Sequence, residues 1–304
     1  MRGWCRSAQR SPLGLTATLA AVEIFSECFE PVGESSLVGL VGVADTSLAV
    51  LLVSGADSHC TRWSPTLIEP LRSRGHRVVR YDHRDSGLSA KVPVDEVYTL
   101  DDLTDDALAV MDAHGIERAH VVGHSMGGMV GQLLALDHAD RVASLTLVAS
   151  TPGLGDDRLP AADEELLDYM MQRLFVGPPT IHADRVSWIV ELDELFAGTR
   201  YPESTENRIR MALAEVDRCW YPESGHGAAV VSSPSRLDRL AGVEVSTLVV
   251  HGTIDPVFPV EHGLALANGI PGADLWLVEG LGHELPDGLV PELLDRLDCL
   301  FAGS

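Results

Sequence analysis

The feature that most constrains the fold is an alternation of two residue patterns along the chain. Short apolar runs bounded by Gly, Asp or Ser are separated by longer stretches with apolar residues at i, i+3 and i+4 spacing. The first pattern predicts buried strands and the second predicts amphipathic helices. Such an order is typical of the α/β class, a mostly parallel central sheet with helices on both faces. The predicted strands cover residues 48–53, 77–81, 119–122, 144–148, 246–250 and 274–278, and the predicted helices cover 67–74, 100–113, 129–137, 260–268 and 289–301.

The alternation stops between residues 151 and 239. This stretch is rich in helix formers, aromatic residues and methionine, and prolines interrupt it. We therefore expect an inserted helical lid, whose apolar side chains fit either a substrate wall or the core of the lid itself. The 304 residues suffice for two average domains or one large one. The pattern favours one core in two parts, 22–150 and 240–304, with the lid at 151–239 and an N-terminal extension at 1–21.

Residues 119–128 have the form of a strand, a Gly-x-Ser-x-Gly turn and the start of a helix. In such a turn the central residue, here Ser125, projects its hydroxyl above the sheet. The flanking positions need glycine because a Cβ there would collide with the neighbouring backbone. The pentapeptide alone would also fit a tight turn with an inert serine. Because a strand precedes it and a helix follows it, we favour a nucleophilic serine.

A serine hydroxyl needs a histidine to take its proton and a carboxylate to orient that histidine. Asp255 lies just after the predicted strand 246–250, and His283 lies just after 274–278. Separately, each residue fits an ordinary loop position. The order Ser125, Asp255, His283, with each residue following a strand, predicts a catalytic triad.

An oxyanion hole requires two backbone N–H donors. One is expected from Met126, the residue after the nucleophile, and the other from the loop after strand 48–53. We favour Ala56 as the second donor, with Gly55 as the alternative. Asp57 follows directly, and we expect its carboxylate to point outward or to cap the next helix.

Two further residues are candidates for the substrate pocket because the motifs place them near Ser125. Trp63 lies in the loop of the second oxyanion donor, and His124 precedes the nucleophile as a pocket or support residue. Arg84 and Asp85 are expected to form a buried pair that fixes their turn.

The charge of the chain excludes several classes of partner. Asp and Glu number 45 and Lys and Arg 22, a formal charge of −23. Nucleic-acid binding and anionic membrane surfaces are therefore not expected. From residue 241 to 304, ten acidic residues accompany the single basic residue Arg296, a local charge of 1 − 10 = −9. Because this segment supplies Asp255 and His283, we expect neutral or cationic substrates to be favoured over anionic ones.

The cysteines and the N-terminus indicate a cytoplasmic protein. The five cysteines are widely spaced, without a C-x-x-C pair, so neither a zinc site nor a disulfide framework is expected. Three arginines before the apolar run 13–22 imitate a secretory signal, but Glu23 interrupts the run and no good cleavage site follows. The sequence contains no run of 18 or more apolar residues, so we expect no segment that spans a membrane.

These residues resemble the α/β-hydrolase superfamily, and within it a bacterial group that includes anthracycline (aclacinomycin) methyl esterases. The resemblance runs from about residue 22 to 300 and rests on segments 80–89, 123–128, 137–142 and 217–222 and on the loops of Asp255 and His283. It implies a hydrolase without metal or cofactor, with Ser125, Asp255 and His283 as catalytic residues and Ala56 and Met126 as oxyanion donors. The chain departs from the family pattern at three places. The link between the first strands, residues 31–46, is longer than usual, the first twenty residues are additional, and Ser246 stands where proline is usual.

We therefore predict a serine hydrolase that cleaves a carboxylic ester of a small, neutral, largely apolar molecule through an acyl-enzyme on Ser125. The same triad would also serve a lactone hydrolase, a C–C bond hydrolase or a cofactor-free perhydrolase (haloperoxidase). A non-catalytic ligand-binding protein on this scaffold is a third interpretation. The expected partner is a small-molecule substrate. The sequence does not decide whether the protein is a monomer or a homo-oligomer.

Overall fold

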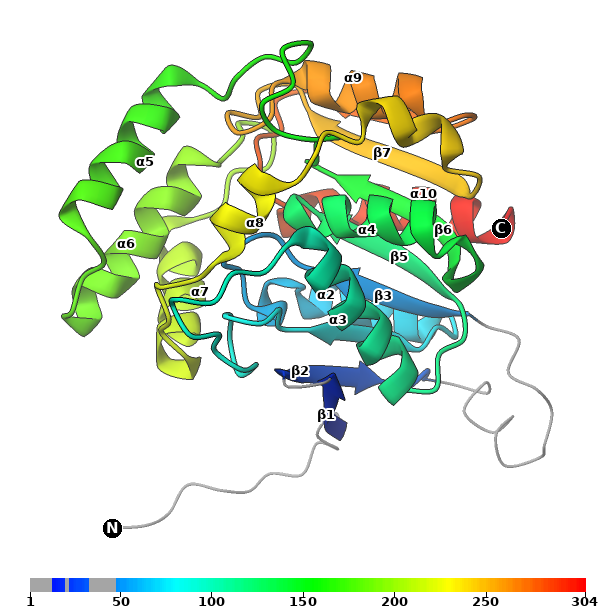
Figure 1. The fold of residues 1–304 in the computed structure, drawn as a ribbon, viewed down its shortest axis with the longest axis horizontal. Helices are drawn as coiled ribbons and strands as arrows, with labels where there is room; N and C mark the ends of the chain where they lie inside the picture. The colour runs from blue at the N-terminus through cyan, green and yellow to red at the C-terminus, as the bar shows by residue number, and fades with distance from the viewer. Residues whose placement is uncertain (1–12, 20–21, 33–47) are drawn as a thin grey trace.

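The computed structural model describes residues 13–19, 22–32 and 48–304. They form an eight-stranded sheet in the order β1-β2-β4-β3-β5-β6-β7-β8 (Figure 1). Strands β3 to β8 pair in parallel, whereas β1 and β2 are antiparallel to their neighbours. The prediction of a mostly parallel α/β sheet is confirmed. The strands are β1 Leu13–Leu19, β2 Val22–Phe29, β3 Ala49–Val53, β4 Val78–Tyr81, β5 Ala119–His124, β6 Val142–Val148, β7 Ser246–Gly252 and β8 Asp274–Val278.

Strands β1 and β2 were not predicted, and β1 lies within residues 1–21, which were expected to be an extension. Buried and more exposed residues alternate along β2, as expected for a strand that has one face against the core. Two of its buried positions are Ser26 and Cys28, so apolar periodicity gives a weak signal there. Residues 1–12 and most of the long link at 31–46 lie outside the described residues.

The central strands are apolar throughout because helices cover both faces of the sheet. On β3, Leu51 and Val53 belong to one core cluster and Val50 and Leu52 to the other, all fully buried. The first cluster includes residues of α3, α4 and α9, and the second includes residues of α2 and α10. These helices span α2 Pro65–Ser73, α3 Leu100–Ala113, α4 Met126–Asp137, α9 Val260–Gly269 and α10 Val290–Ala302.

Local capping decides where these helices begin. Helix α2 begins two residues before its predicted start because Ser64 accepts a hydrogen bond from the Thr66 N–H and Pro65 occupies the first turn. Helix α3 begins at its predicted residue, after a capping box between Thr99 and Asp102.

Four α-helices lie between β6 and β7, in the segment predicted to be a lid and called the lid below: α5 Glu164–Val176, α6 His182–Leu195, α7 Thr205–Arg218 and α8 His226–Ser232. Helices α5, α6 and α7 stand together on the left of Figure 1, with α8 between them and the core. Helices α6 and α7 share a small apolar core, against which Trp220 packs. By contrast, α5 leaves Met170, Met171, Leu174 and Phe175 exposed. The lid's apolar residues thus divide between its own core and its surface.

Within the described residues, no helix combines the length and apolarity needed to cross a membrane.

Candidate active site

Ser125 lies in the sharp turn between β5 and α4. Its backbone has φ 54° and ψ −119°, a strained conformation for a residue with a side chain. Tight packing around two glycines maintains the turn. A Cβ on Gly123 would lie 2.3 Å from the Gly127 oxygen, and a Cβ on Gly127 would lie 2.0 Å from the Val53 oxygen. The spacing of the motif is thus explained by close backbone approach on both sides of Ser125.

Three side chains from separate loops meet at the carboxyl edge of the parallel strands. The Ser125 Oγ lies 2.9 Å from His283 Nε2, and His283 Nδ1 lies 2.8 and 3.1 Å from the two Asp255 carboxylate oxygens. Asp255 follows β7 and His283 follows β8, and both are at least 95% buried. Ser125 itself is partly exposed. The structure therefore brings together the three residues that the sequence singled out.

The Asp255 carboxylate is stabilised by three donors. Besides His283, the N–H groups of Val257 and Phe258 each donate to Oδ1 at 2.9 Å. Burial alone would raise the pKa of Asp255, but the charge and hydrogen bond of His283 outweigh it and hold this pKa below its usual value. An ionised Asp255 keeps a proton on His283 Nδ1, which leaves Nε2 able to accept the proton of Ser125.

His124 supports the loop of His283. Its Nε2 lies 2.8 Å from the His283 carbonyl oxygen. Burial, together with the nearby His283, lowers the pKa of His124 to about 4, so the ring is neutral near pH 7 and its Nε2–H donates to that carbonyl. Of the two roles predicted for His124, the structure favours support over a place in the pocket.

The candidate oxyanion donors lie beside Ser125. Met126 is the first residue of α4, where backbone N–H groups have no acceptor within the helix. A Cβ on Gly55 would lie 3.3 Å from the Ser125 Cβ, so the loop after β3 runs next to the nucleophile. Among the residues described, no acceptor takes the N–H of Gly55, Ala56 or Met126. The geometry accommodates Ala56 or Gly55 as the second donor.

Asp57 has its carboxylate at the surface, as predicted, but it caps no helix. Its backbone has φ 60°, and its N–H donates to the Nδ1 of His226 in the lid at 2.9 Å. The Nε2 of His226 lies 2.8 Å from the Arg84 carbonyl oxygen. This fully buried histidine of α8 therefore joins the loop after β3 to the Arg84 turn.

Trp63 lies in the hydrophobic core, 2% exposed, and not in the pocket where it was predicted. It belongs to the cluster on the α2 and α10 side of the sheet, together with Leu67 and Ile68 of α2. The physical reason is its position two residues before α2, where its indole extends the buried face of that helix.

The expected pair of Arg84 and Asp85 is wrong. Arg84 instead forms a two-pronged ion pair with Asp106 of α3, at 2.7 and 2.8 Å. Asp85 has φ 65° and accepts from the Val92 N–H and the Tyr98 hydroxyl. Arg84 therefore pairs with α3, whereas Asp85 fixes its own loop through Val92 and Tyr98.

Sequence reasoning missed the ion pairs that bind the lid to the core. Three charged residues of α7 take part, each with a partner on a different core loop, and no spacing in the sequence indicates these pairings. The pairs are Arg208 with Glu284 at 3.0 Å, Glu215 with Arg62 at 2.6 Å and Arg218 with Asp82 at 2.6 Å. Segment 217–222, which contributed to the family resemblance, contains Arg218 but does not identify its partner. No such segment contains Arg208 or Glu215.

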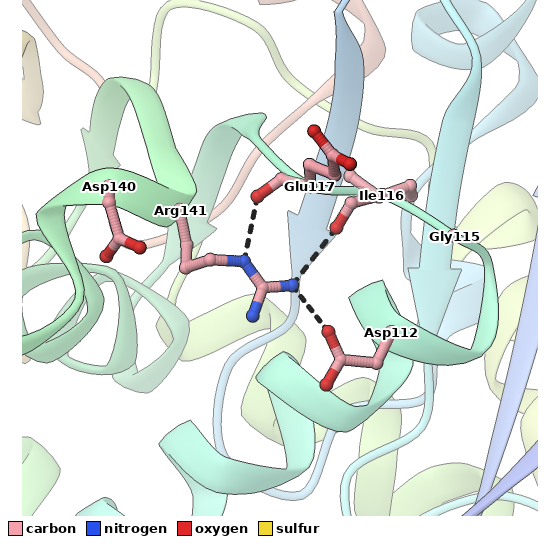
Figure 2. Close-up of a pocket in the computed structure, with 6 residues that line it drawn as sticks. All are labelled: Asp112, Gly115, Ile116, Glu117, Asp140 and Arg141. Carbon is pink, nitrogen blue, oxygen red and sulfur yellow. Dashed lines mark hydrogen bonds and ion pairs between the residues drawn. The ribbon is translucent and has the colours of Figure 1, made fainter.

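A separate surface pocket lies at the opposite edge of the sheet. Figure 2 shows its lining from the segments that precede β5 and β6. There Arg141 donates to Asp112 at 2.6 Å and to the carbonyl oxygens of Ile116 and Glu117 at 3.0 and 2.8 Å. Segment 137–142, which contributed to the resemblance, thus joins two turns far from Ser125 and has a structural role.

Comparison with known proteins agrees with this fold. The family model described as alpha/beta hydrolase fold matches residues 49–287. Rhodomycin D methylesterase DauP from Streptomyces sp. (strain C5) is 34% identical over 264 residues, covering 81% of this chain and 88% of the relative. A protein that carries the name carbamate hydrolase RutD, from Caulobacter vibrioides (strain NA1000 / CB15N), is 46% identical over 240 residues, covering 77% and 82%.

Among solved structures, the esterase EaEST from Exiguobacterium antarcticum superimposes with a TM-score of 0.72 at 20% identity, covering 94% of this chain and 96% of the esterase. The enol-lactonase from Burkholderia xenovorans LB400 gives 0.68 at 20% identity, covering 93% and 100%. These two likenesses concern the fold alone. Taken with the family match and the extent of the Streptomyces similarity, they show that the chain belongs to the α/β-hydrolase family.

Proposed function

We propose that this protein is a serine hydrolase of carboxylic esters, with Ser125 as nucleophile, His283 as general base and acid, and Asp255 as the group that orients His283. The observation that carries the proposal is the continuous hydrogen-bonded chain from the Asp255 carboxylate through His283 to the Ser125 hydroxyl. Such a chain activates a hydroxyl that is otherwise a weak nucleophile at neutral pH.

The reaction proceeds in two halves. As Ser125 Oγ bonds to the ester carbonyl carbon, His283 Nε2 takes the serine proton, and the N–H groups of Met126 and Ala56 stabilise the oxyanion. His283 then returns this proton to the departing alcohol as the C–O bond breaks, which leaves an acyl group on Ser125. In the second half, His283 takes a proton from water, the resulting hydroxide attacks the acyl carbon, and the proton returns to Ser125 as the acid leaves.

Several observations support a neutral and largely apolar substrate. The ring of Phe196, a half-buried residue after α6, lies 5.2 Å from the ring of His283. The C-terminal segment that supplies Asp255 and His283 is strongly acidic. The name of the Streptomyces relative favours a methyl ester of such a molecule. We infer a reaction without metal or cofactor, since the triad and backbone donors supply every step above.

The proposed location is the cytoplasm. Cys28, Cys60, Cys219 and Cys299, the cysteines within the described residues, are all free thiols. Free thiols of this number are typical of a reducing compartment.

The decisive experiment replaces the nucleophile. Ser125→Ala is expected to lower kcat for p-nitrophenyl butyrate by about 10⁴- to 10⁶-fold, because no other group in the chain of hydrogen bonds can attack the carbonyl. Labelling by a fluorophosphonate should disappear in the same variant. Ser73→Ala, on the exposed side of α2, is the matched control and should behave as wild type. Full activity in Ser125→Ala would exclude the proposed nucleophile.

A substrate panel separates the reactions that share this triad. Purified wild-type protein is tested with methyl esters, lactones, a carbamate and a vinylogous diketone, each with and without hydrogen peroxide. An ester hydrolase shows its highest kcat/KM with the esters and gains nothing from peroxide. Tight binding without turnover or fluorophosphonate labelling would instead indicate a ligand-binding protein.

A further inference from the structure

We infer that the lid forms part of the support of the catalytic histidine, and that Arg208 of α7 is a positioning residue for His283. This inference rests on the proposed role of His283 as general base. It assigns to the lid an effect on the chemical step.

The first observation is a set of backbone hydrogen bonds between the lid and the loop of His283. Residues 196–200, here called the strap, form the first part of the connection between α6 and α7. The Phe196 carbonyl accepts from the N–H of His283 itself at 2.8 Å, and the N–H groups of Thr199 and Arg200 donate to the Gly280 carbonyl at 2.7 and 3.1 Å. The catalytic loop is therefore bonded to the lid at two points, one of them the catalytic residue.

The second observation is that strap and loop approach each other closely enough to require glycine. A Cβ on Gly198 would lie 2.4 Å from the Gly280 oxygen, and a Cβ on Gly282 would lie 2.2 Å from the Phe196 oxygen. Both clashes involve backbone atoms, which cannot move aside without shifting the chain. The contact is thus as tightly packed as the nucleophile turn itself.

The third observation is a largely buried ion pair that contacts the strap. The carboxylate of Glu284, the residue after His283, accepts from the Gly198 N–H through Oε1 and from Arg208 through Oε2, both at 3.0 Å. Arg208 is 8% exposed and also donates to the Asp193 carbonyl at the end of α6. Arg208 therefore joins α6 and α7 to the residue next to the catalytic histidine.

Together these contacts hold His283 from two sides. On the core side, His124 bonds the His283 carbonyl, and on the lid side Phe196 bonds its N–H. The 2.9 Å distance between His283 Nε2 and Ser125 Oγ depends on both, and catalytic groups must be held within about 0.5 Å of the productive geometry. Loss of the lid side is expected to slow proton transfer, which affects kcat, while a small ester binds as before.

The test compares Arg208→Met with Arg210→Met. Arg210 lies on the same helix but is exposed, so it is the matched control. With p-nitrophenyl acetate, R208M should lower kcat by about 10- to 100-fold at nearly unchanged KM, as expected for a displacement on the order of 1 Å. Arg208→Lys, which keeps the charge, should recover part of the loss, and R210M should match wild type. All assays are run well below the thermal midpoint of each variant.

A second variant addresses the same contact without changing charge. Gly198→Ala should reproduce the loss of kcat because its Cβ forces the strap away from Gly280. If R208M does not fold, Glu284→Gln replaces it, since glutamine still accepts from Gly198 but removes the ionic contact, and a smaller loss of kcat is expected. Wild-type kcat in folded R208M and G198A, or a loss confined to KM, would overturn the inference. Failure of the proposed function looks different, because wild type itself would then lack esterase activity and Ser125 labelling.

Discussion

At the scale of single residues, roles follow from the partners that the fold supplies. Asp255 remains ionised in a buried site because His283 and two backbone N–H groups surround it. Trp63 and Arg84 have partners that their motifs did not indicate. Trp63 was expected in the substrate pocket and packs in the core. Arg84 was expected to pair with Asp85 and pairs with Asp106.

Asp255→Asn tests this orienting role. An asparagine can donate its amide hydrogen to His283 Nδ1, which favours the tautomer that cannot take the serine proton. We expect kcat to fall by about 10⁴-fold while Ser125 stays in place. Asp274→Asn, exposed at the start of β8, should leave kcat unchanged. Comparable kcat values for the two variants would contradict the assignment of Asp255.

At the scale of elements, α7 and β5 are fixed in the fold by different interactions, ion pairs for α7 and a buried histidine for β5. Helix α7 is held by charges, because Arg208, Glu215 and Arg218 each pair with a core loop. Strand β5 carries a buried histidine, His120, which bonds the Ser144 hydroxyl at 2.8 Å and stacks on Phe301 of α10 at 3.9 Å. Burial lowers the pKa of His120 to about 4, so the folded protein keeps this ring neutral.

The low pKa of His120 makes stability depend on pH. Because the unfolded chain takes up this proton near pH 6.5 and the folded chain only near pH 4, stability is full above 6.5 and falls between these values. His120→Gln should flatten the slope of the unfolding free energy in this window by up to about 1.4 kcal/mol per pH unit. Urea unfolding at pH 7, 6, 5 and 4.5 measures both slopes. Parallel slopes in the two proteins would exclude His120 as a contributor.

At the scale of the whole molecule, the acidic charge should select among substrates. The chain carries −23 overall, and its last 64 residues carry ten of the acidic side chains with one arginine. The structure moderates this count near His283, because Arg208 of the lid pairs with Glu284. Beyond that pair, the remaining field acts over about 8 Å at physiological salt.

A pair of esters that differ only in charge measures this field. At low ionic strength, a neutral p-nitrophenyl ester should give a higher kcat/KM than an analogue of the same length that ends in a carboxylate. Added salt should raise kcat/KM for the anionic ester and leave the neutral ester unchanged, because screening removes the repulsion. A preference for the anionic ester at low salt would show that local cations dominate the site.

The sequence by itself determined the class of sheet, the positions of six strands to within two residues at either end, and the order Ser125, Asp255, His283. These follow from local rules, since apolar periodicity marks buried strands and parallel strands carry their following loops to one edge. It could not indicate β2, where Ser26 and Cys28 occupy core-facing positions, or β1 beside it.

Only the tertiary structure decided which groups support the triad. His124, the strap at 196–200 and the pair of Arg208 with Glu284 hold the loop of His283, although 76 residues separate Arg208 from Glu284 in the chain. Ion pairs and close backbone contacts depend on the relative placement of the lid and the core, and sequence spacing does not encode that placement. The chemistry of the site is therefore evident in the sequence, whereas its preorganisation is a property of the packed molecule.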